Sequence, residues 1–359
     1  VWRMEHREMI TVLYQFTIRQ INFGTLILLF CLMGVVAGIQ RLGYIDLCTL
    51  YLMNRAQNIR RIAYYLIGSS FFFSMFLTND VALIILVPFT IGIINRIGAS
   101  DQLIRFIVLE TIAANMGSML TPIGNPQNVF LYQNYKMTFV AFYRIILPYG
   151  VVAFVLLGIF IFILFPTEPI EQEQNITDTG KAYVIKHKLL WTIVFIVLFL
   201  LCILTVLRFV PHVVTFFAVF IGVFLCDRKI FCRINYGLLI KFIILFIVVG
   251  DVAQIPWINK MLSTMIVGNE VAGGILISQI VSNVPAAILI ARFTSNGNAL
   301  LLGVNIGGLG TLIASMASMI SLDYYEKSIF ADKKAYILSF TKYNILFLLI
   351  EIVFVLLLL

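Results

Sequence analysis

Long apolar runs joined by short polar connections make up most of the chain. A helix needs roughly 20 apolar residues to cross a bilayer, and about ten stretches of this sequence meet that need. The runs are continuous rather than alternating, and backbone polar groups in lipid must be hydrogen-bonded internally, so helices are predicted and a β-barrel is excluded. The runs are 21–39, 44–53, 62–77, 81–95, 103–120, 139–165, 189–207, 210–226, 236–258, 271–282, 284–293, 299–320 and 336–359. This pattern predicts an all-α polytopic membrane protein.

Several of these runs are too short to span a bilayer alone, and others are interrupted by Gly, Pro or Asn. Short or interrupted segments at matching positions of two halves indicate the binding site of a secondary transporter. The polar stretch 166–188 is rich in Glu and Gln and predicts a solvated linker. We therefore divide the chain into a first transmembrane repeat at 1–165, this linker, and a second repeat at 189–359.

Three blocks of sequence recur in the same order in both halves. They pair LFCLMGVVAGI (29–39) with LFIVVGDVAQI (245–255), MFLTNDVALIILVPF (75–89) with QIVSNVPAAILIARF (279–293), and NMGSMLTPI (115–123) with NIGGLGTLI (305–313). Leu and Ile matches between apolar segments carry little information, so the inference depends on Gly and polar positions. The polar pairs are Asn22/Asn235, Asn79/Asn283, Asn115/Asn305 and Thr121/Thr311. The blocks predict two inverted-topology repeats.

Composition is typical of a membrane protein and argues against nucleic-acid binding. Hydrophobic residues make up 61% of the chain and charged residues 12%, whereas soluble domains carry about 25% charged residues. The net charge is +8, and basic residues such as Arg60, Arg61, Arg228 and Lys229 lie in short loops. This is the positive-inside pattern of cytoplasmic loops. The charge therefore indicates insertion into a cell membrane rather than binding to nucleic acid.

Asp80 is the only charged residue between Arg61 and Arg96. A carboxylate at a helix centre costs roughly 2.5–3.5 kcal/mol on membrane-insertion scales, so an acid there predicts a functional site with a cation or proton as partner. The alternative is that Thr78-Asn79-Asp80 lies in a loop at the membrane surface and caps the next helix. No polar linker separates the flanking runs, which favours a functional break within the membrane.

Ser282 and Asn283 repeat the hydroxyl–amide pair of the first half, and Pro285 follows them. Proline fits the first turn of a helix and disrupts a helix interior. The segment therefore predicts a helix, a short unwound Ser-Asn stretch and a second helix. An unwound point frees carbonyls for a cation, and a new helix N-terminus presents N–H groups to an anion. Val284 occupies the position that an acid holds in the first half.

The segment 115–128 carries two prolines, two glycines and several amide side chains within an apolar region. Amides and hydroxyls supply neutral oxygen ligands, and glycine lets backbones approach closely. The glycines alone are explained equally well by close helix packing, but together with Asn and Thr they favour a lined cavity. The candidates are Asn115, Gly117, Thr121, Asn125 and Asn128, with Asn305, Gly307 and Thr311 in the second half.

Two further acids lie in apolar segments. Asp251 is the only charge between Lys241 and Lys260, so each half contributes one lone acid at a non-equivalent position. Glu110 has Arg105 five residues before it, and either pairing with this arginine or a place at a loop edge would explain it. Asp251 is therefore a candidate for ion coupling, and Glu110 stays open.

With these segments in place, the sequence resembles the ion transporter superfamily, which includes divalent-anion:sodium symporters, citrate permeases, arsenite and silicate efflux permeases and one class of sodium/proton antiporters. Thr78-Asn79-Asp80 and Ser282-Asn283-Val284 stand where that superfamily carries paired Ser-Asn-Thr signatures. TPIGNPQN at 121–128 resembles its Gly-Thr-Pro-Pro-Asn segment, and the resemblance extends from about Asn22 to the end. The arsenite, silicate and citrate branch is the most similar.

The resemblance implies two scaffold regions, two broken helices, a homodimer and elevator-type movement. It also implies re-entrant hairpins at about 21–58 and 234–268, with Asp251 near the tip of the second. Two apolar runs precede the second hairpin, so up to two further helices before residue 1 are implied. Dicarboxylate symporters carry a hydroxyl at the third signature position in both halves. Asp80 would repel a dianion unless it is protonated or holds a cation.

These observations predict a secondary active transporter for a small anion or weak oxyacid, such as a carboxylate or an arsenite-like solute, coupled to a proton or sodium gradient. The substrate-binding candidates are Thr78, Asn79, Asp80, Ser282, Asn283, Val284, Asn125 and Asn128. The ion-coupling candidates are Asp80, Asn79, Asn115, Gly117, Thr121, Asp251, Asn283, Asn305, Gly307 and Thr311. No organic cofactor is expected, and Na⁺ is the only metal considered. The alternative is a channel or a structural membrane subunit of a larger complex, and no enzyme motif such as HExxH or GxSxG is present.

Overall fold

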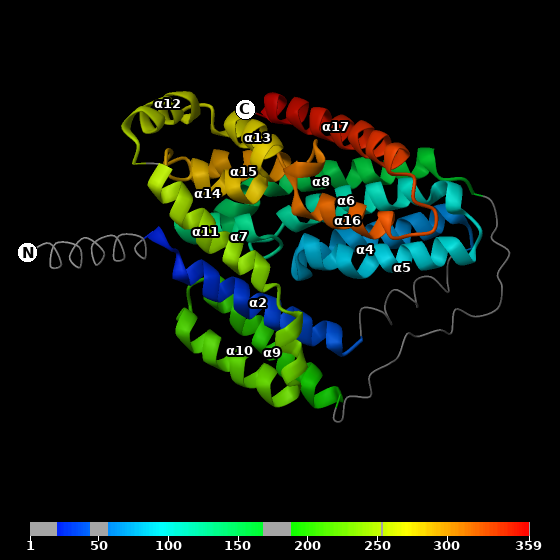
Figure 1. Cartoon of the computed structure of the whole chain (residues 1–359), viewed down its shortest axis with the longest axis horizontal. Coiled ribbons are helices and arrows are strands. Elements are labelled where there is room, and N and C mark those ends of the chain that lie inside the picture. The colour runs from blue at the N-terminus through cyan, green and yellow to red at the C-terminus, as the bar shows by residue number, and fades with distance from the viewer. Residues whose placement is uncertain (1–19, 44–56, 168–187, 253, 359) are drawn as a thin grey trace, which may run out of the picture.

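The computed structural model describes residues 20–43, 57–167, 188–252 and 254–358, which form helices joined by turns (Figure 1). Helices that are long and apolar enough to cross a membrane occur five times in this part of the chain. They are α2 (Phe23–Arg41), α5 (Asn79–Arg96), α8 (Phe139–Leu164), α9 (Lys188–Val206) and α17 (Lys333–Leu358). The predicted all-α polytopic membrane fold is confirmed. Residues 168–187 of the predicted linker lie outside the described part.

The first half forms a bundle around α6 (Leu103–Met119). The remaining elements of this bundle are α4 (Ile59–Leu77), α5, the 3-10 helix η1 (Ser100–Gln102), α7 (Pro126–Asn134) and α8. The proline-rich segment ends α6 as predicted, and α7 begins with Pro126, whose missing N–H is not needed at a first helical position. The Asn125 side chain accepts the Asn128 N–H and caps this helix.

The second half contains its helices in a similar order, and the first three of them are shorter than those of the first half. Its elements are α13 (Glu270–Val281), α14 (Asn283–Ile290), α15 (Gly297–Ile306), the 3-10 helix η3 (Leu312–Ala314), α16 (Met316–Glu326) and α17. The predicted run 299–320 is therefore divided by a turn after Ile306. α16 packs on α5 and α6, and α17 packs on α6 and α8, so the two halves share one body (Figure 1).

A second group of helices lies beside this body. α2 and α9 pack with α10 (His212–Cys226), and Figure 1 shows the three together. After the 3-10 helix η2 (Arg228–Arg233), α11 (Tyr236–Val252) runs from this group to α14. The predicted run 236–258 is two helices, because α12 (Pro256–Ile266) begins at a proline. Residues 44–56 of the first expected hairpin lie outside the described part.

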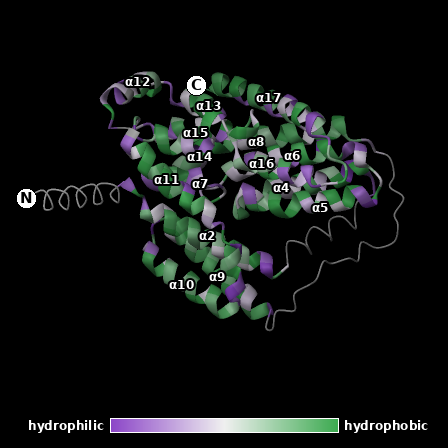
Figure 2. Cartoon of the chain, viewed as in Figure 1, coloured by the Kyte–Doolittle hydropathy of each residue, from purple (hydrophilic) through white to green (hydrophobic). Residues whose placement is uncertain are grey.

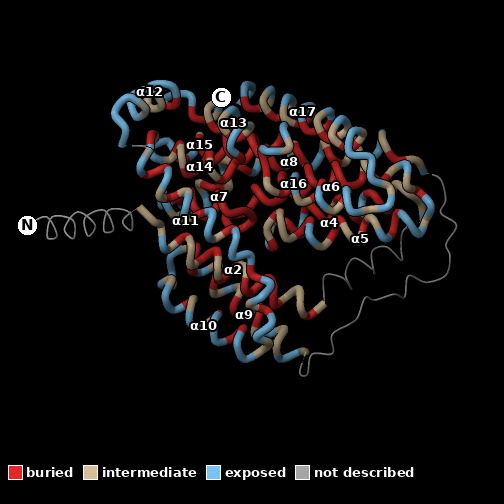
Figure 3. Tube along the Cα trace, viewed as in Figure 1, coloured by how far each residue is buried: buried red, intermediate tan, exposed pale blue. Residues whose placement is uncertain are grey.

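Burial separates a central helix from helices that face lipid. Every residue of α6 from Phe106 to Met119 is buried, although several are polar. α8, α9 and α17 instead expose large apolar side chains, such as Ile163, Leu189 and Leu357. Figure 2 shows the apolar colouring of these outer helices, and Figure 3 shows the buried interior. A helix that buries polar groups on all sides needs internal partners for them.

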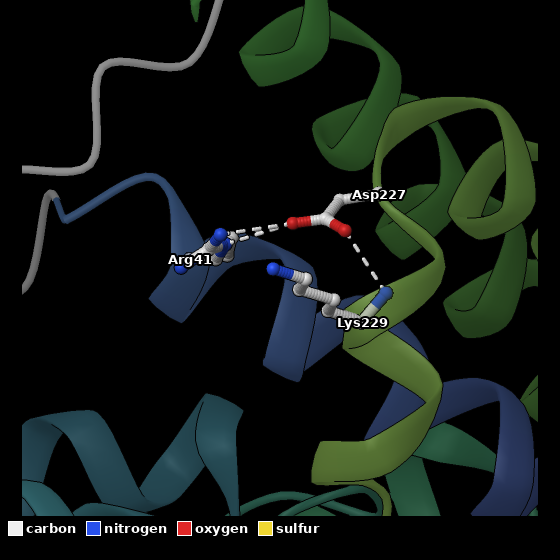
Figure 4. A network of polar contacts seen from close by, with 3 residues as sticks. All are labelled: Arg41, Asp227 and Lys229. Atoms are coloured by element: carbon white, nitrogen blue, oxygen red, sulfur yellow. Dashed lines mark hydrogen bonds and ion pairs between the residues drawn. The ribbon is translucent and has the colours of Figure 1, made fainter.

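An ion pair joins the end of α2 to the start of η2 (Figure 4). The Arg41 guanidinium donates to Asp227 Oδ2 from Nε at 3.1 Å and lies 3.0 Å from it through Nη2. The Lys229 backbone N–H donates to Asp227 Oδ1 at 2.9 Å. Burial alone would raise the pKa of the Asp227 carboxyl, but these hydrogen bonds outweigh it and hold the pKa below its usual value.

Candidate functional site

The predicted break in the first half lies at a single residue. α4 ends at Leu77 and α5 begins at Asn79, and Thr78 between them has φ 73° and ψ 151°. This backbone region is used almost only by glycine, and a residue held there costs of order 1–3 kcal/mol. Thr78 makes no side-chain capping bond to α5. The capping interpretation of this segment is therefore wrong for Thr78.

The second half breaks at the matching position with the same backbone conformation. α13 ends at Val281, α14 begins at Asn283, and Ser282 has φ 78° and ψ 155°. The predicted unwound Ser-Asn stretch is thus one residue long, because Asn283 already belongs to a helix. Strained non-glycine residues persist only where the surrounding structure holds them, and they gather at binding sites.

Two threonines, one in the turn after α6 and one in the turn after α15, each bond to the helix that precedes a break. Thr121 Oγ1 donates to the carbonyl of Met75, and Thr311 Oγ1 donates to the carbonyl of Gln279 at 3.1 Å. Each of these carbonyls belongs to the third residue before its break residue. Thr121 is buried and Thr311 is exposed. The two predicted threonine partners therefore make the same contact in both halves.

The paired glycines also occupy matching places. A Cβ at Gly117 would lie 2.0 Å from the carbonyl oxygen of Phe71 in α4. A Cβ at Gly307 would lie 2.9 Å from the Cα of Ile275, the corresponding residue of α13. Both glycines are therefore required by close helix packing, which is the alternative that the sequence left open.

Asn115 connects the two halves through its side chain. Its Oδ1 accepts from Asn79 Nδ2 at 3.0 Å and from Ser315 Oγ at 2.9 Å, and its Nδ2 donates to the Gly308 carbonyl at 3.4 Å. A Cβ at Gly308 would in turn lie 3.0 Å from Asn283 Nδ2. The first residues of α5 and α14 therefore approach one another across Asn115 and Gly308.

Asn305 makes the reciprocal connection from the second half. Asn125 Nδ2 donates to Asn305 Oδ1 at 3.0 Å, and Asn305 Nδ2 donates to Asn128 Oδ1 at 2.7 Å. Asn128 Nδ2 donates further to the Thr121 carbonyl at 3.0 Å. All three asparagines are buried. We call the residues Asn79, Asn115, Asn125, Asn128 and Asn305 the asparagine network.

Asp80 lies at the edge of this network. The residue is half-buried, and its backbone N–H donates to Asn79 Oδ1 at 2.9 Å. Within the described part of the chain, its carboxylate accepts no hydrogen bond and forms no ion pair, although the charge of Lys241 on α11 acts on it. Val284, at the matching position of α14, is buried. The paired breaks therefore carry one carboxylate between them.

Comparison with known proteins identifies the family to which this chain belongs. The family described as citrate transporter matches residues 8–299 of the chain. The chain belongs to the citrate transporter family. It is 30% identical to the inner membrane protein YbiR of Escherichia coli, over 84% of this chain and 80% of that protein. It is 33% identical to an uncharacterized transporter of Methanocaldococcus jannaschii, over 84% and 81%. A 75-residue segment, 21% of this chain and 15% of the relative, is 35% identical to the silicon efflux transporter LSI3 of Oryza sativa.

Membership of this family makes the protein an integral membrane transporter of a small solute. It also confirms the resemblance to the ion transporter superfamily that the signature segments indicated. The roles of the individual residues remain predictions. The structure brings the predicted residues of 78–80, 115–128, 282–284 and 305–311 together around the two breaks, as the contacts above describe.

One predicted site residue of this citrate transporter family member, Asp251, lies away from the two breaks. Asp251 is exposed near the end of α11 and accepts a hydrogen bond from Gln20 Nε2 at 3.2 Å. The Gln20 carbonyl accepts from Arg292 Nη2 at 3.3 Å. Arg292, Gln20 and Asn134 line a cleft of about 550 Å³ whose wall does not include the break residues. No described residue links Asp251 to the asparagine network by a hydrogen bond.

The sequence analysis missed two residues of this transporter's site. Gln279 donates to the carbonyls of Gly307 and Leu309 at 3.0 and 2.9 Å and accepts from the Thr311 N–H at 2.9 Å, so it holds the turn after α15. Ser315 was missed as well. Gln279 is aligned with Met75 in the matched blocks. This pairing of a polar residue with an apolar one was the feature of the sequence that could have identified Gln279. Ser315 follows the third block, beyond the matched positions.

Proposed function

We propose that the protein is a secondary active transporter that moves a small anion or weak oxyacid, driven by a proton or sodium gradient. The observation that carries the proposal is the pair of helix breaks at Thr78 and Ser282. They share one strained backbone conformation and meet through Asn115 and Gly308. Discontinuous helices that meet between repeats form the substrate and ion sites of many secondary transporters.

The solute chemistry follows from the helix ends at the breaks. α5 and α14 begin at Asn79 and Asn283, and helix N-termini carry partial positive charge that favours an anion. The carboxylate of Asp80 lies beside them and repels a dianion, so a monoanion or a neutral weak oxyacid fits better. The family is named for citrate, which carries three carboxyl groups, so its binding here would require Asp80 to be protonated or to hold a cation.

Asp80 supplies the proposed coupling group. A carboxylate without a hydrogen-bond partner, next to amide and hydroxyl oxygens, is able to bind a proton or a sodium ion reversibly. Neutral oxygens of the kind that alkali cations bind would complete the shell of the ion, and we propose Asn79, Asn115 and Thr121 as their source. A single ion held there would also neutralise the charge that opposes an anionic solute. Binding of ion and solute at the breaks would then be cooperative.

The arrangement of helices supports an elevator movement. Both breaks belong to one body made of α4–α8 and α13–α17, whereas α2, α9 and α10 form the neighbouring group (Figure 1). We propose that the body carrying the breaks slides against this group. A homodimer, held through the second group, is part of the same proposal and rests on the superfamily resemblance.

The test is Asp80→Asn in liposomes with an imposed proton or sodium gradient. Asn keeps the shape of Asp and can hydrogen-bond, but it cannot change charge. With labelled citrate, silicic acid or arsenite as solutes, the parent should accumulate at least one of them. The Asn variant should still exchange labelled for unlabelled solute while losing accumulation against the gradient.

Asp323→Asn is the matched control, because Asp323 is an exposed acid on α16 whose partner is Lys327. It should accumulate solute as the parent does. If Asp80→Asn also accumulates solute as the parent does, then Asp80 is not the coupling residue. A parent that only dissipates gradients, with no counterflow, would be a channel and would refute the proposed function.

A further inference from the structure

A second buried acid lies away from the helix breaks. Glu110 is in the middle of α6 with 0% of its surface exposed. Thr90 Oγ1 of α5 donates to Glu110 Oε1 at 2.5 Å, and Glu110 Oε2 has no hydrogen-bond partner. Arg105 instead donates to Gln102 Oε1 at 2.7 Å and to the Leu164 carbonyl. Both explanations that the sequence suggested for Glu110, pairing with Arg105 and a loop edge, are therefore wrong.

Hydroxyl-bearing side chains from three other helices lie around this part of α6. Tyr336 of α17 is fully buried, and its hydroxyl lies near Thr111 and Glu110 without a hydrogen bond to the Glu110 carboxyl. Thr111 Oγ1 donates to Ser321 Oγ of α16 at 2.7 Å. Thr90 completes the set from α5. Four helices thus meet at a polar cluster that is closed to solvent.

The charge balance of the cluster favours a neutral carboxyl. A buried ionised carboxylate costs several kcal/mol unless a cation or several donors compensate it. Among the described residues, no Lys, Arg or His forms an ion pair with Glu110, and its one donor is Thr90. A protonated carboxyl has an O–H to donate, and Thr90 Oγ1, 2.5 Å from Glu110 Oε1, is able to accept it. Within the described part of the chain, the other titratable groups beside the cluster are Tyr336 of α17 and Tyr325 of α16, whose rings stack at 4.8 Å.

The second half contains a contrasting pair. Thr294, which matches Thr90 in the repeat, donates to Glu270 Oε1 at 2.7 Å. The Gly268 N–H donates to the same oxygen at 3.2 Å, and Glu270 is the first residue of α13. The positive end of a helix stabilises an anion, so Glu270 has what a carboxylate needs and Glu110 does not. The same threonine contact is therefore made to acids in opposite environments.

We propose that Glu110, hydrogen-bonded to Thr90, forms a proton-binding site separate from Asp80. Glu110 lies five residues before Asn115 on α6, which is about 7.5 Å along the helix axis. A proton bound or released at Glu110 changes the packing of α5, α6 and α17 close to the network that joins the breaks. The assignment of this proton to transport rests on the proposed function, but the binding of the proton does not.

The test is infrared difference spectroscopy of the protein in liposomes over a pH series. A protonated carboxyl gives a C=O stretch that an ionised one lacks. We expect one such band that titrates with pH, is lost in Glu110→Gln, and shifts in frequency in Thr90→Val, because that variant keeps the shape of Thr90 and removes the hydroxyl that bonds to Glu110. Glu270→Gln is the matched control and should leave this band unchanged. Glu351 is a second buried acid and lies on α17. Its own infrared band is identified separately by its loss in Glu351→Gln.

Two results would overturn the proposal. One is the absence of a titrating band that Glu110→Gln removes, and the other is a band that Thr90→Val leaves at the same frequency. Because the Thr90→Val variant retains Glu110, it keeps the test valid if Glu110→Gln folds poorly. In transport, Glu110→Gln should lose the pH dependence of solute uptake. The spectroscopic result needs no transport, so it stands or fails independently of the Asp80 test.

Discussion

The two halves of this transporter share a backbone design and differ in charge. Thr78 and Ser282 have nearly the same φ and ψ. In contrast, the first half carries Asp80 and Glu110, where the second half has Val284 and Leu300. The two similar breaks therefore come together, and only the first of them carries a carboxylate, because Asp251 of the second half lies away from the breaks. The comparison teaches that the two breaks share a backbone conformation, while the carboxylate proposed to bind the ion is present at one of them only.

The largest effect is expected from removing the side-chain amide at either break. Asn79→Ala and Asn283→Ala should each reduce solute uptake to the level of protein-free liposomes, because both helix starts form the proposed site. They should differ in stability. Asn79 gives a hydrogen bond to Asn115, so its loss should lower the free energy of unfolding by about 1 kcal/mol, whereas Asn283→Ala should cost less. Uptake that persists in Asn283→Ala would mean that the second break is not part of the site.

Packing at the paired glycines should be unequal as well. Gly117→Ala places a Cβ 2.0 Å from a backbone oxygen of α4, and Gly307→Ala places one 2.9 Å from a backbone carbon of α13. We expect losses of about 3 and about 1 kcal/mol of unfolding free energy, respectively, since overpacking against backbone forces helices apart. Thermal unfolding in detergent measures both. Equal losses would show that the first half is packed no more tightly than the second.

Relief of backbone strain should have a smaller effect of the opposite sign. Thr78→Gly should raise the free energy of unfolding by about 1 kcal/mol, because glycine adopts a positive φ without a clash. Ser282→Gly also loses two weak contacts at 3.4 Å, to Asn283 Oδ1 and the Ala314 carbonyl, so its gain should be smaller. Destabilisation by Thr78→Gly would show that its side chain, rather than its backbone, matters at the break.

The smallest effect is expected at the ion pair between Arg41 and Asp227, which joins the two halves. The pKa of the Asp227 carboxyl is held below its usual value, so the pair contributes stability above about pH 4 and loses it as pH falls through that lowered pKa. Asp227→Asn should lower the unfolding free energy by about 0.5–1 kcal/mol at neutral pH, and this loss should shrink as the pH falls through the lowered pKa. A difference that grows on acidification would contradict this sign.

The sequence by itself determined where the helices break. Asp80 within an apolar run, Pro285 after a Ser-Asn pair and the prolines of 115–128 are local features, and each forbids an ordinary continuous span. The matched blocks also indicated which residues correspond between the halves. These predictions needed only the rules for helices in lipid, because a buried polar group or a proline acts on its own segment.

Only the tertiary structure decided which polar groups meet. Asn115 pairs with Asn79 and Ser315, residues 36 and 200 positions away, and no local pattern distinguishes these partners from other hydroxyls and amides. Glu110 has Arg105 within two turns of its own helix, yet its partner is Thr90 of α5. The enclosure of α6 by its neighbours fixes this choice, because a side chain buried on all sides can bond only to what the packed helices place beside it.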